Sequence, residues 1–267
     1  MFSRFLLGIG ILLGILCLSS GAWATVYDLN TDTSYSLRIM GGRASDQIGQ
    51  GGVRVADIDG DGNLDMIINA YNADFNSVSD RGATYFIWNL PSRTGTLDLN
   101  ADKSPRDFNV AIFGNASGDG LGFNDIAIGD LDHDGQSNDI AIGAYAADPK
   151  SRDAAGAVYV FKDIHLESGI IDLAQQSGRS KVDLNILGSA ASDSFGWAQT
   201  FFGDADADGY NDDLVVGAQG VDSPQTGSGC VYLIQDVNSK LGSIDLLSPG
   251  SAVNLRVCSN TINGAMG

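Results

Sequence analysis

The chain has 267 residues, with 33 acidic against 15 basic residues and a formal net charge of −18. This acidity argues against a nucleic-acid partner, because the phosphates would be repelled. All acidic residues except Glu167 are Asp, which prefers turns and caps to helix interiors. Together with 35 glycines, this composition predicts strands and turns with little helix. It favours a protein that holds cations or stays soluble outside the cell.

The N-terminal residues have the pattern of a signal peptide. Arg4 precedes an unbroken apolar and glycine run over residues 5–18, and Ala22-Trp23-Ala24 is a small-x-small cleavage pattern. The run is shorter than the roughly 18 to 20 residues that span a bilayer. We therefore predict that residues 1–24 are removed and that the mature chain starts at Thr25 without a transmembrane segment. It would be secreted, extracellular or at the cell surface, with the periplasm as an alternative; an uncleaved N-terminal anchor is the competing interpretation.

The chain contains an internal repeat, which governs the rest of the interpretation. Acidic loops open at Asp57, Asp130 and Asp204, which gives spacings of 73 and 74 residues. Two landmarks follow each loop: GATYFIW, GAVYVF and GCVYLI, and then TGTLDL, SGIIDL and GSIDL. The repeat region is predicted to cover residues 25–267, with repeats at about residues 50–114, 115–188 and 189–260.

Each repeat is predicted to contain four short strands. In the first repeat these are Val53–Asp57, Met66–Ala70, Ala83–Trp88 and Asp107–Phe113. The runs are rich in Val, Ile, Tyr and Phe and are bounded by Gly, Asp and Ser, which is typical of strands. A repeated four-stranded unit is typical of a propeller blade, so the sequence predicts an all-β fold and a β-propeller. The period exceeds the roughly 40 to 50 residues of common blades, and we assign the excess to polar connections such as Asn89–Arg106.

The two ends of the chain fit the same pattern. Residues 36–40 match the fourth strand of a repeat whose first three strands are missing, and residues 255–258 align with residues 37–40. Three blades and one orphan strand cannot close a ring and would leave sheet faces open. We therefore expect an incomplete ring, that is, a fragment of a longer protein truncated at its C-terminus.

The mature chain has two cysteines, Cys230 and Cys258. An exported protein can keep a disulfide, but two buried thiols fit the sequence equally well. No CxxC motif exists, and His133 and His165 stand alone. This pattern argues against a zinc site.

The first acidic loop alternates side-chain oxygens with other residues, in the order Asp57, Asp59, Asp61, Gly62, Asn63 and Asp65. Gly62 allows a sharp turn, the carbonyl of Asn63 can face inward, and Asp65 closes the shell. Calcium takes six to eight oxygen ligands, and carboxylates crowded so closely would repel one another without a cation. Magnesium fits less well, because it demands octahedral geometry and keeps its waters. The loop therefore predicts a calcium site, with a solvated Asp/Gly turn as the alternative.

The second and third loops carry one extra residue. Asn138 and Asp139 compete for the closing position of the second loop, as Asp212 and Asp213 do in the third. We favour Asp139 and Asp213, because each immediately precedes an apolar strand as Asp65 does. The predicted ligands of about three Ca²⁺ ions are Asp57, Asp59, Asp61, Asn63 and Asp65 in the first loop; Asp130, Asp132, Asp134, Gln136 and Asp139 in the second; and Asp204, Asp206, Asp208, Tyr210 and Asp213 in the third.

These residues resemble a known family. Gly122-Phe123, then Ala127-Ile128-Gly129 and the run DLDHDGQSNDIAIGA, are similar to the FG-GAP repeat of integrin α-subunit β-propellers. Phe195-Gly196 with Gly217-Ala218 repeats the pattern, whereas the first copy departs from it with Ile48-Gly49 and Asn69-Ala70. The resemblance implies a propeller of about seven blades, calcium held between the first and second strands of a blade, and a role in cell adhesion or surface recognition. The extra residue in the second and third loops departs from the usual nine-residue spacing.

The leading functional hypothesis is a non-enzymatic, calcium-binding module that recognises an unknown protein or glycan. No GxSxG elbow is present, and neither histidine has a recurring partner, so we predict no catalytic residue and no organic cofactor. One alternative is the propeller portion of a larger secreted enzyme, a lipase or a polysaccharide-active enzyme, since some lipases and lyases carry FG-GAP repeats. Another is a structural protein of an envelope or extracellular matrix.

Overall fold

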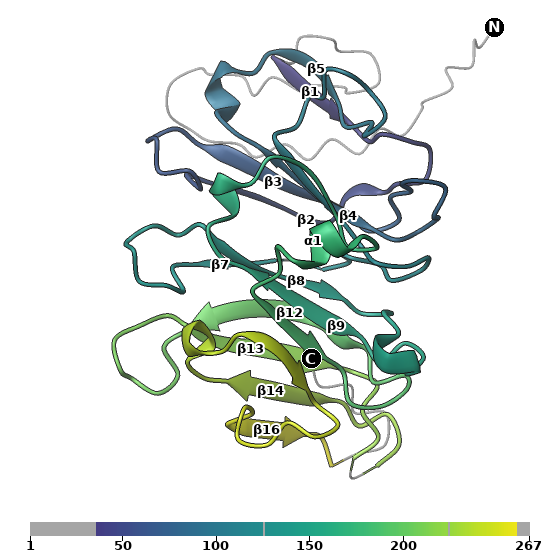
Figure 1. The fold of residues 1–267 in the computed structure, drawn as a ribbon, viewed down its shortest axis with the longest axis vertical. Helices are drawn as coiled ribbons and strands as arrows, with labels where there is room; N and C mark the ends of the chain where they lie inside the picture. The colour runs from purple at the N-terminus through teal and green to yellow at the C-terminus, as the bar shows by residue number, and fades with distance from the viewer. Residues whose placement is uncertain (1–35, 125, 224, 261–267) are drawn as a thin grey trace, which may run out of the picture. The chain divides into compact units, whose positions relative to one another are not determined.

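The computed structural model describes residues 36–124, 126–223 and 225–260, and the chain is all-β (Figure 1). The predicted signal peptide and Thr25 lie outside these described residues. Within them, no helix is long and apolar enough to cross a membrane. The helical segments are α1 (Gln176–Arg179) and the 3₁₀ turns η1 (Leu90–Ser92), η2 (Pro149–Ser151), η3 (Ile164–Leu166) and η4 (Val237–Ser239).

The strands of the described residues form four sheets. The first sheet has the order β10-β6-β4-β3-β2, from β2 (Ile48–Ala56), β3 (Asp65–Ala70), β4 (Ala83–Ile87), β6 (Val110–Phe113) and β10 (Gly169–Asp172). The second has the order β15-β11-β9-β8-β7, from β7 (Ala127–Gly129), β8 (Asp139–Ala144), β9 (Ala157–Phe161), β11 (Leu184–Leu187) and β15 (Gly242–Asp245). The third has the order β12-β13-β14-β16, from β12 (Phe195–Gly203), β13 (Asp213–Ala218), β14 (Cys230–Ile234) and β16 (Leu255–Cys258). A pair of strands, β1 (Leu37–Met40) and β5 (Gly95–Asp98), forms the fourth.

The four strands predicted for the first repeat are confirmed as β2, β3, β4 and β6, which pair antiparallel in that order. The prediction that Asn89–Arg106 is only a polar connection is wrong, because β5 lies within it. β5, β10 and β15 each pair in parallel with the last strand of the preceding repeat. The residues of β5 show no alternation of apolar side chains, since only Leu97 is buried. Its strand conformation therefore depends on the partner strand rather than on its own sequence.

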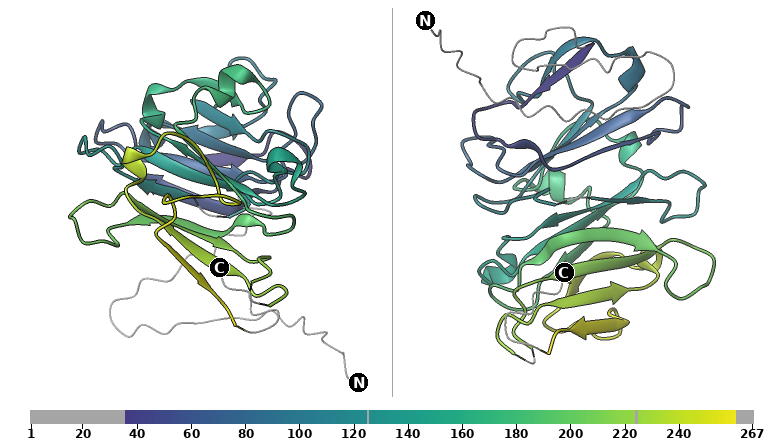
Figure 2. Two further views of the ribbon diagram at one scale, coloured as in Figure 1. Left: turned by 60° about the horizontal axis from the view of Figure 1, so that its bottom comes forward. Right: turned by 180° about the vertical axis from the view of Figure 1, so that it is seen from behind.

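The hydrophobic core lies between the sheets. Along β4, Phe86 packs in a cluster with residues of the second sheet, whereas Tyr85 and Ile87 pack in a separate cluster on the opposite face. This alternation follows from the period of two in a strand. All five residues of β4 are buried, which explains its continuous apolar sequence. Burial of each large apolar side chain of this kind contributes roughly 1.5–3 kcal/mol, and the sheets lie face to face in the views of Figure 2.

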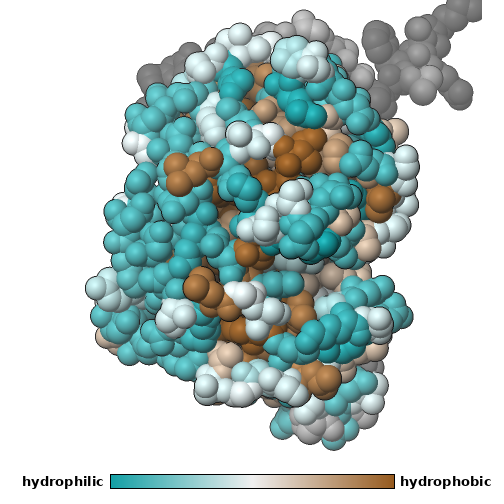
Figure 3. Space-filling view, viewed as in Figure 1, coloured by the Kyte–Doolittle hydropathy of each residue, from teal (hydrophilic) through white to brown (hydrophobic). Residues whose placement is uncertain are grey.

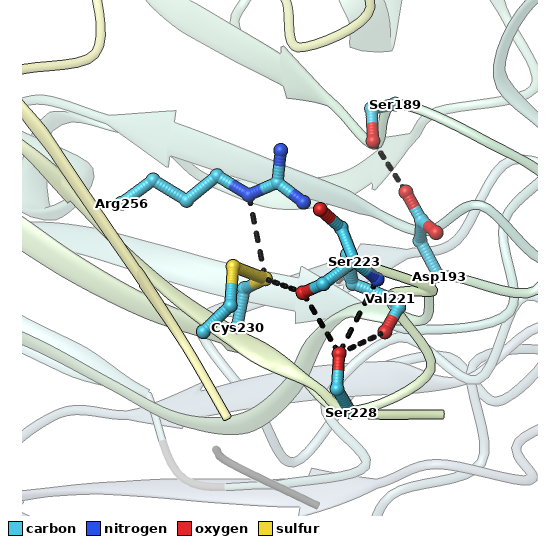
Figure 4. Close-up of a disulfide and its surroundings, with 8 residues drawn as sticks. Ser189, Asp193, Val221, Ser223, Ser228, Cys230 and Arg256 are labelled. Carbon is cyan, nitrogen blue, oxygen red and sulfur yellow. Dashed lines mark hydrogen bonds between the residues drawn. A yellow bond between two sulfur atoms is a disulfide. The ribbon is translucent and has the colours of Figure 1, made fainter. Parts of the chain in front are cut away.

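The two cysteines of the third repeat form a disulfide (Figure 4). Cys230 of β14 and Cys258 of β16 are direct partners in an antiparallel register, so the pairing that the sequence left open is settled. Closing a loop over a sequence separation of 28 residues stabilises the fold by about 3.5 kcal/mol if the effect is chain entropy alone. Arg256 Nε lies 3.3 Å from Cys230 Sγ, and its guanidinium lies over the ring of Tyr232.

The surface is mainly polar on the face drawn in Figure 3, where hydrophobic residues emerge in separate patches. The most exposed large apolar side chains are Leu166 and Leu241, at 72% and 73%. Apolar side chains scattered in this way are normal on a folded domain and do not by themselves mark a docking surface.

Candidate metal centres

The three acidic loops connect the first two strands of three successive sheets, namely β2 with β3, β7 with β8, and β12 with β13. They project on the same side of the stacked sheets, at the left in Figure 1 and at the right in the reverse view of Figure 2. The internal repeat therefore places the same acidic hairpin at the same corner of each sheet.

Each loop is held in shape by its own carboxylates. In the first loop, Asp57 Oδ2 accepts the N–H of Gly62 at 3.0 Å, and Asp61 Oδ1 accepts the N–H of Asn63 at 2.7 Å. The corresponding aspartates of the other loops, Asp130 and Asp204, accept the N–H of Gly135 at 3.0 Å and of Gly209 at 3.1 Å. Asp side chains favour such turns because they bond to nearby backbone amides. The three glycines have φ values of 86°, 91° and 98°, a region in which other residues are strained.

The last aspartate of each loop is buried and joins the loop to the strand beyond. Asp65 is fully buried and accepts the N–H groups of Ile58, Asp59 and Asn89, at 2.7, 3.3 and 2.8 Å. Three acceptor interactions leave one of about four lone pairs of a carboxylate free. Asp65 therefore has few free lone pairs for a metal ion unless this hydrogen-bond network rearranges.

Asp139 and Asp213 occupy the same structural position as Asp65. Asp139 accepts the N–H groups of Leu131, Asp132 and Asp163 at 2.5, 3.2 and 2.8 Å. Asp213 accepts the equivalent three, from Ala205, Asp206 and Asp236, at 2.6, 3.2 and 3.0 Å. The competing residues lie elsewhere: Asn138 contacts His165, with Nδ2 3.0 Å from Nδ1, and Asp212 faces His133. Asp139 and Asp213 are thus the structural counterparts of Asp65, while their role as ligands stays a prediction.

Five groups of carboxylates could hold a metal ion, each with ligand atoms within 4.8 Å of one another. Among the described residues these groups are Asp57, Asp59 and Asp61; Asp130, Asp132 and Asp134; Asp132, Asp139 and Asp163; Asp204, Asp206 and Asp213; and Asp206, Asp208 and Asp236. Asp65 belongs to none of these groups. Asn63, Gln136 and Tyr210 donate their backbone N–H groups to Asp61, Asp134 and Asp208, and their service as carbonyl ligands stays a prediction.

The negative charge of these loops has little compensation. Among the ion pairs of the described residues, none joins a loop carboxylate to Lys or Arg; the single partner is His133, whose Nε2 lies 3.4 Å from Asp212 Oδ2. Burial raises the pKa of Asp139 to about 6, although N–H donors oppose the effect. Burial also raises the pKa of Asp59 and Asp206, whereas the N–H of Asn63 lowers that of Asp61. A bound divalent cation would become the largest local charge and favour the ionised carboxylates.

Sequence reasoning missed Asp163 and Asp236. Both follow the third strand of their sheets, in the left-handed conformation, and their first-repeat counterpart is Asn89. Each of these three residues donates its backbone N–H to the last aspartate of its loop, across 24, 24 and 23 residues. This long-range hydrogen bond brings the residue to the loop. The sequence did carry a signal, since IWN, FKD and IQD recur at one position of the repeat.

Neighbouring loops also contact each other. The ring of His133 stacks on that of Tyr210, with centroids 3.7 Å apart and an angle of 14° between the planes. The first and second loops meet where Gly60 faces Gln136, since a Cβ at position 60 would lie 2.6 Å from Gln136 Oε1. The three candidate centres therefore form a row in which each loop touches the next.

The fold and these loops define an all-β protein with several acidic clusters that could hold metal ions. No protein-family model matches the chain, and no curated protein matches it either.

Proposed function

We propose that the chain is a non-enzymatic, calcium-binding β-propeller module of the FG-GAP type that is exported and recognises a protein or glycan. One observation carries the proposal. Three loops with the same hydrogen-bonded scaffold each gather carboxylate oxygens within 4.8 Å of one another, without a Lys or Arg partner among the described residues. Oxygen-rich sites of this kind suit calcium, which accepts six to eight oxygens, better than magnesium.

The strand order supports the propeller part of the proposal. The antiparallel series β2-β3-β4-β6 recurs as β7-β8-β9-β11 and as β12-β13-β14-β16. Successive four-stranded blades would have this order. The parallel strands β10 and β15 tie one repeat to the next, which would stiffen a module built to present a surface.

The disulfide supports export. Disulfides persist in oxidising compartments and are rare in the cytosol, and Cys230–Cys258 joins two strands of the third sheet. A location outside the cytosol also supplies the calcium that the loops would need. Weak extracellular calcium modules bind at about 10⁻⁴–10⁻³ M.

Thermal unfolding of the chain without residues 1–24, in calcium and in EGTA, tests the proposal. A site held at 100 times its Kd adds about 2.7 kcal/mol, and each kcal/mol raises Tm by about 2–4 °C for a domain of this size. We expect calcium to raise Tm by about 5–10 °C for each occupied site, and magnesium to raise it less.

The triple variant Asp59→Asn, Asp132→Asn and Asp206→Asn should lose most of this gain, because it removes one ligand charge from each loop while keeping an oxygen acceptor. The control is Asp102→Asn, Asp153→Asn and Asp222→Asn, which makes the same change of net charge outside the loops and should keep the gain. Equal melting of the unsubstituted chain in calcium and in EGTA would contradict the proposal.

A further inference from the structure

A pocket of about 460 Å³, lined by polar and apolar side chains in similar measure, opens on the second sheet beside Tyr159 of β9. Asn185 and Leu187 of β11, Ser243 of β15, and Val182 and Arg179 from the connection after β10 also line it. None of its lining residues belongs to an acidic loop. Its volume lies within the range of about 300–1,000 Å³ that is usual for small-ligand sites.

The corresponding place in the first repeat is filled by aromatic rings. Phe75 and Phe113 stack with centroids 4.4 Å apart, and Tyr85 meets Phe108 at 5.3 Å and Phe113 at 5.9 Å. None of the four side chains is more than 8% exposed. The rings leave Tyr85 only 2% exposed, whereas Tyr159, which is 7% exposed, lines the pocket.

The register of the strands identifies the equivalent positions. Tyr85 lies opposite Ala111 as Tyr159 lies opposite Asn185. By the same alignment, Phe75, Phe108 and Phe113 of the first repeat correspond to Pro149, Val182 and Leu187 of the second. Three aromatic side chains are thus replaced by smaller ones, which opens the pocket.

Two further differences make the opened space partly polar. Ala111 pairs with Ile170 in the first sheet, and the matching pair in the second sheet is Asn185 with Ser243. Smaller walls alone would leave an apolar cavity, which costs stability. Here two apolar side chains are replaced by hydrogen-bonding ones at the positions that face the space.

The hydrogen-bonding groups of the pocket are available. Asn185 Oδ1 is buried and has no hydrogen-bond partner among the described residues, which costs about 1–3 kcal/mol unless a ligand or water satisfies it. The hydroxyls of Tyr159 and Ser243 likewise make no hydrogen bond to another described residue. Burial raises the pKa of Tyr159, so its hydroxyl stays neutral and can both donate and accept.

The charged side chains at the pocket already have partners. Lys150 Nζ lies 2.8 Å from Asp245, and Arg179 Nη1 donates to the carbonyls of Leu173 and Ala174 at 3.0 and 2.8 Å. Asp148 Oδ1 accepts the N–H of Ala154 at 2.7 Å. The pocket therefore offers neutral donors and acceptors beside an aromatic ring, while these charged side chains are held by hydrogen bonds or an ion pair to other parts of the protein.

We propose that this pocket binds a neutral polyhydroxylated ligand, a sugar unit of a glycan. Sugar hydroxyls both donate and accept hydrogen bonds, which matches the side chains of Tyr159, Asn185 and Ser243. The apolar walls formed by Val182 and Leu187 suit the C–H face of the sugar ring. The inference rests on the recognition role proposed above. It specifies that the ligand is a sugar and that the second repeat binds it.

Saturation-transfer NMR and calorimetric titration test this site, with glucose, galactose, mannose and N-acetylglucosamine as neutral probes and glucuronate as the ionised one. The chain without residues 1–24 is used in calcium and in EGTA. We expect transfer to at least one neutral sugar and weaker transfer to glucuronate. Asn185→Ala, which restores the first-repeat residue, should weaken binding at least about 10-fold, and Tyr159→Phe about 3- to 10-fold.

The chain provides a matched control in Tyr85→Phe, which removes the same hydroxyl at the equivalent position of the first repeat and should leave binding unchanged. Val182→Phe introduces the residue found at the equivalent first-repeat position, Phe108, and should abolish binding by filling the pocket. If Val182→Phe misfolds, Tyr159→Phe still tests the site, because it removes only one oxygen. Absence of transfer to every neutral sugar would overturn the proposal, as would binding that Asn185→Ala and Tyr159→Phe leave unchanged. The calcium-dependent shift of Tm, read on the same samples, reports separately on the proposed calcium function.

Discussion

The first and second repeats each have an acidic hairpin of the same design. They differ on the sheet face that carries the equivalent residues Tyr85 and Tyr159. The loop hydrogen bonds agree closely, since Asp65 and Asp139 each accept three N–H groups from equivalent positions. By contrast, aromatic rings surround Tyr85, whereas a pocket lies beside Tyr159. The loop must satisfy many backbone groups with few residues, so its sequence is constrained. The sheet face only has to bury area, so it can diverge and acquire a binding site.

A second difference concerns the ion pair that joins each sheet to the next repeat. Arg81 is fully buried, pairs with Asp172 of β10, and donates to the carbonyl of Gly114. In the second repeat, Arg152 pairs with Asp245 of β15 at 2.9 Å, and neither side chain is fully buried. The same link between repeats is thus made once inside the protein and once near its surface.

The largest expected effect comes from breaking the buried pair. Arg81→Ala leaves Asp172 without its partner and the carbonyl of Gly114 without its donor, and should cost about 3–5 kcal/mol of unfolding free energy. Arg152→Ala should cost about 1 kcal/mol, because water can solvate Asp245. Urea unfolding of the two variants measures the difference. Equal costs would show that the two links are energetically alike.

The partly buried pair of the second repeat also predicts how stability depends on pH. Lys150 and Arg152 lower the pKa of Asp245 to about 2, below the value of about 3.9 in an unfolded chain. The folded state therefore binds fewer protons than the unfolded state between these values. The pair stabilises the fold above about pH 4, and this contribution is lost as the pH falls towards 2. We expect a loss of about 1 kcal/mol, reduced by solvent screening.

Urea unfolding across this acid range should show a smaller loss in the double variant Lys150→Ala and Arg152→Ala. Lys181→Ala is the matched control, because it removes a surface lysine paired with Glu167 and leaves Asp245 paired. An unchanged pH dependence in the double variant would mean that these side chains do not set the ionisation of Asp245.

The smallest expected effect distinguishes the proposed calcium sites of the first and second loops. The first loop has Asn89 where the second has Asp163, so the second offers one more carboxylate. Because ligand charge tunes calcium affinity, Asn89→Asp should tighten the first site and Asp163→Asn should weaken the second, each by about 3- to 10-fold. Calorimetric titration with calcium measures both, with Asp222→Asn as a control. Identical isotherms would place Asp163 outside the ligand sphere.

Much of the candidate site could be predicted from sequence, because its determinants are local. Asp57, Asp59 and Asp61 lie two residues apart and bond to amides within five residues. Asp163 could not be found in this way, since it reaches the loop only through bonds across 24 and 25 residues, to Asp139 and Asn138. The different positions of Asp139 and Asn138 also depend on tertiary contacts, since Asp139 accepts the N–H of Leu131 within the hairpin and Asn138 contacts His165.

The sequence by itself determined the four antiparallel β-strands of the first repeat, the hairpins between the first two strands and the turns of the acidic loops. These depend on side-chain alternation, on Asp bonding to nearby amides and on glycine at positive φ, all of which act over a few residues. Only the tertiary structure decided where β5, β10 and β15 pair, that Cys230 bonds to Cys258, and that a pocket opens beside Tyr159. Each of these depends on contacts between residues far apart in the chain, such as Arg81 with Asp172 across 91 positions, which no local pattern encodes.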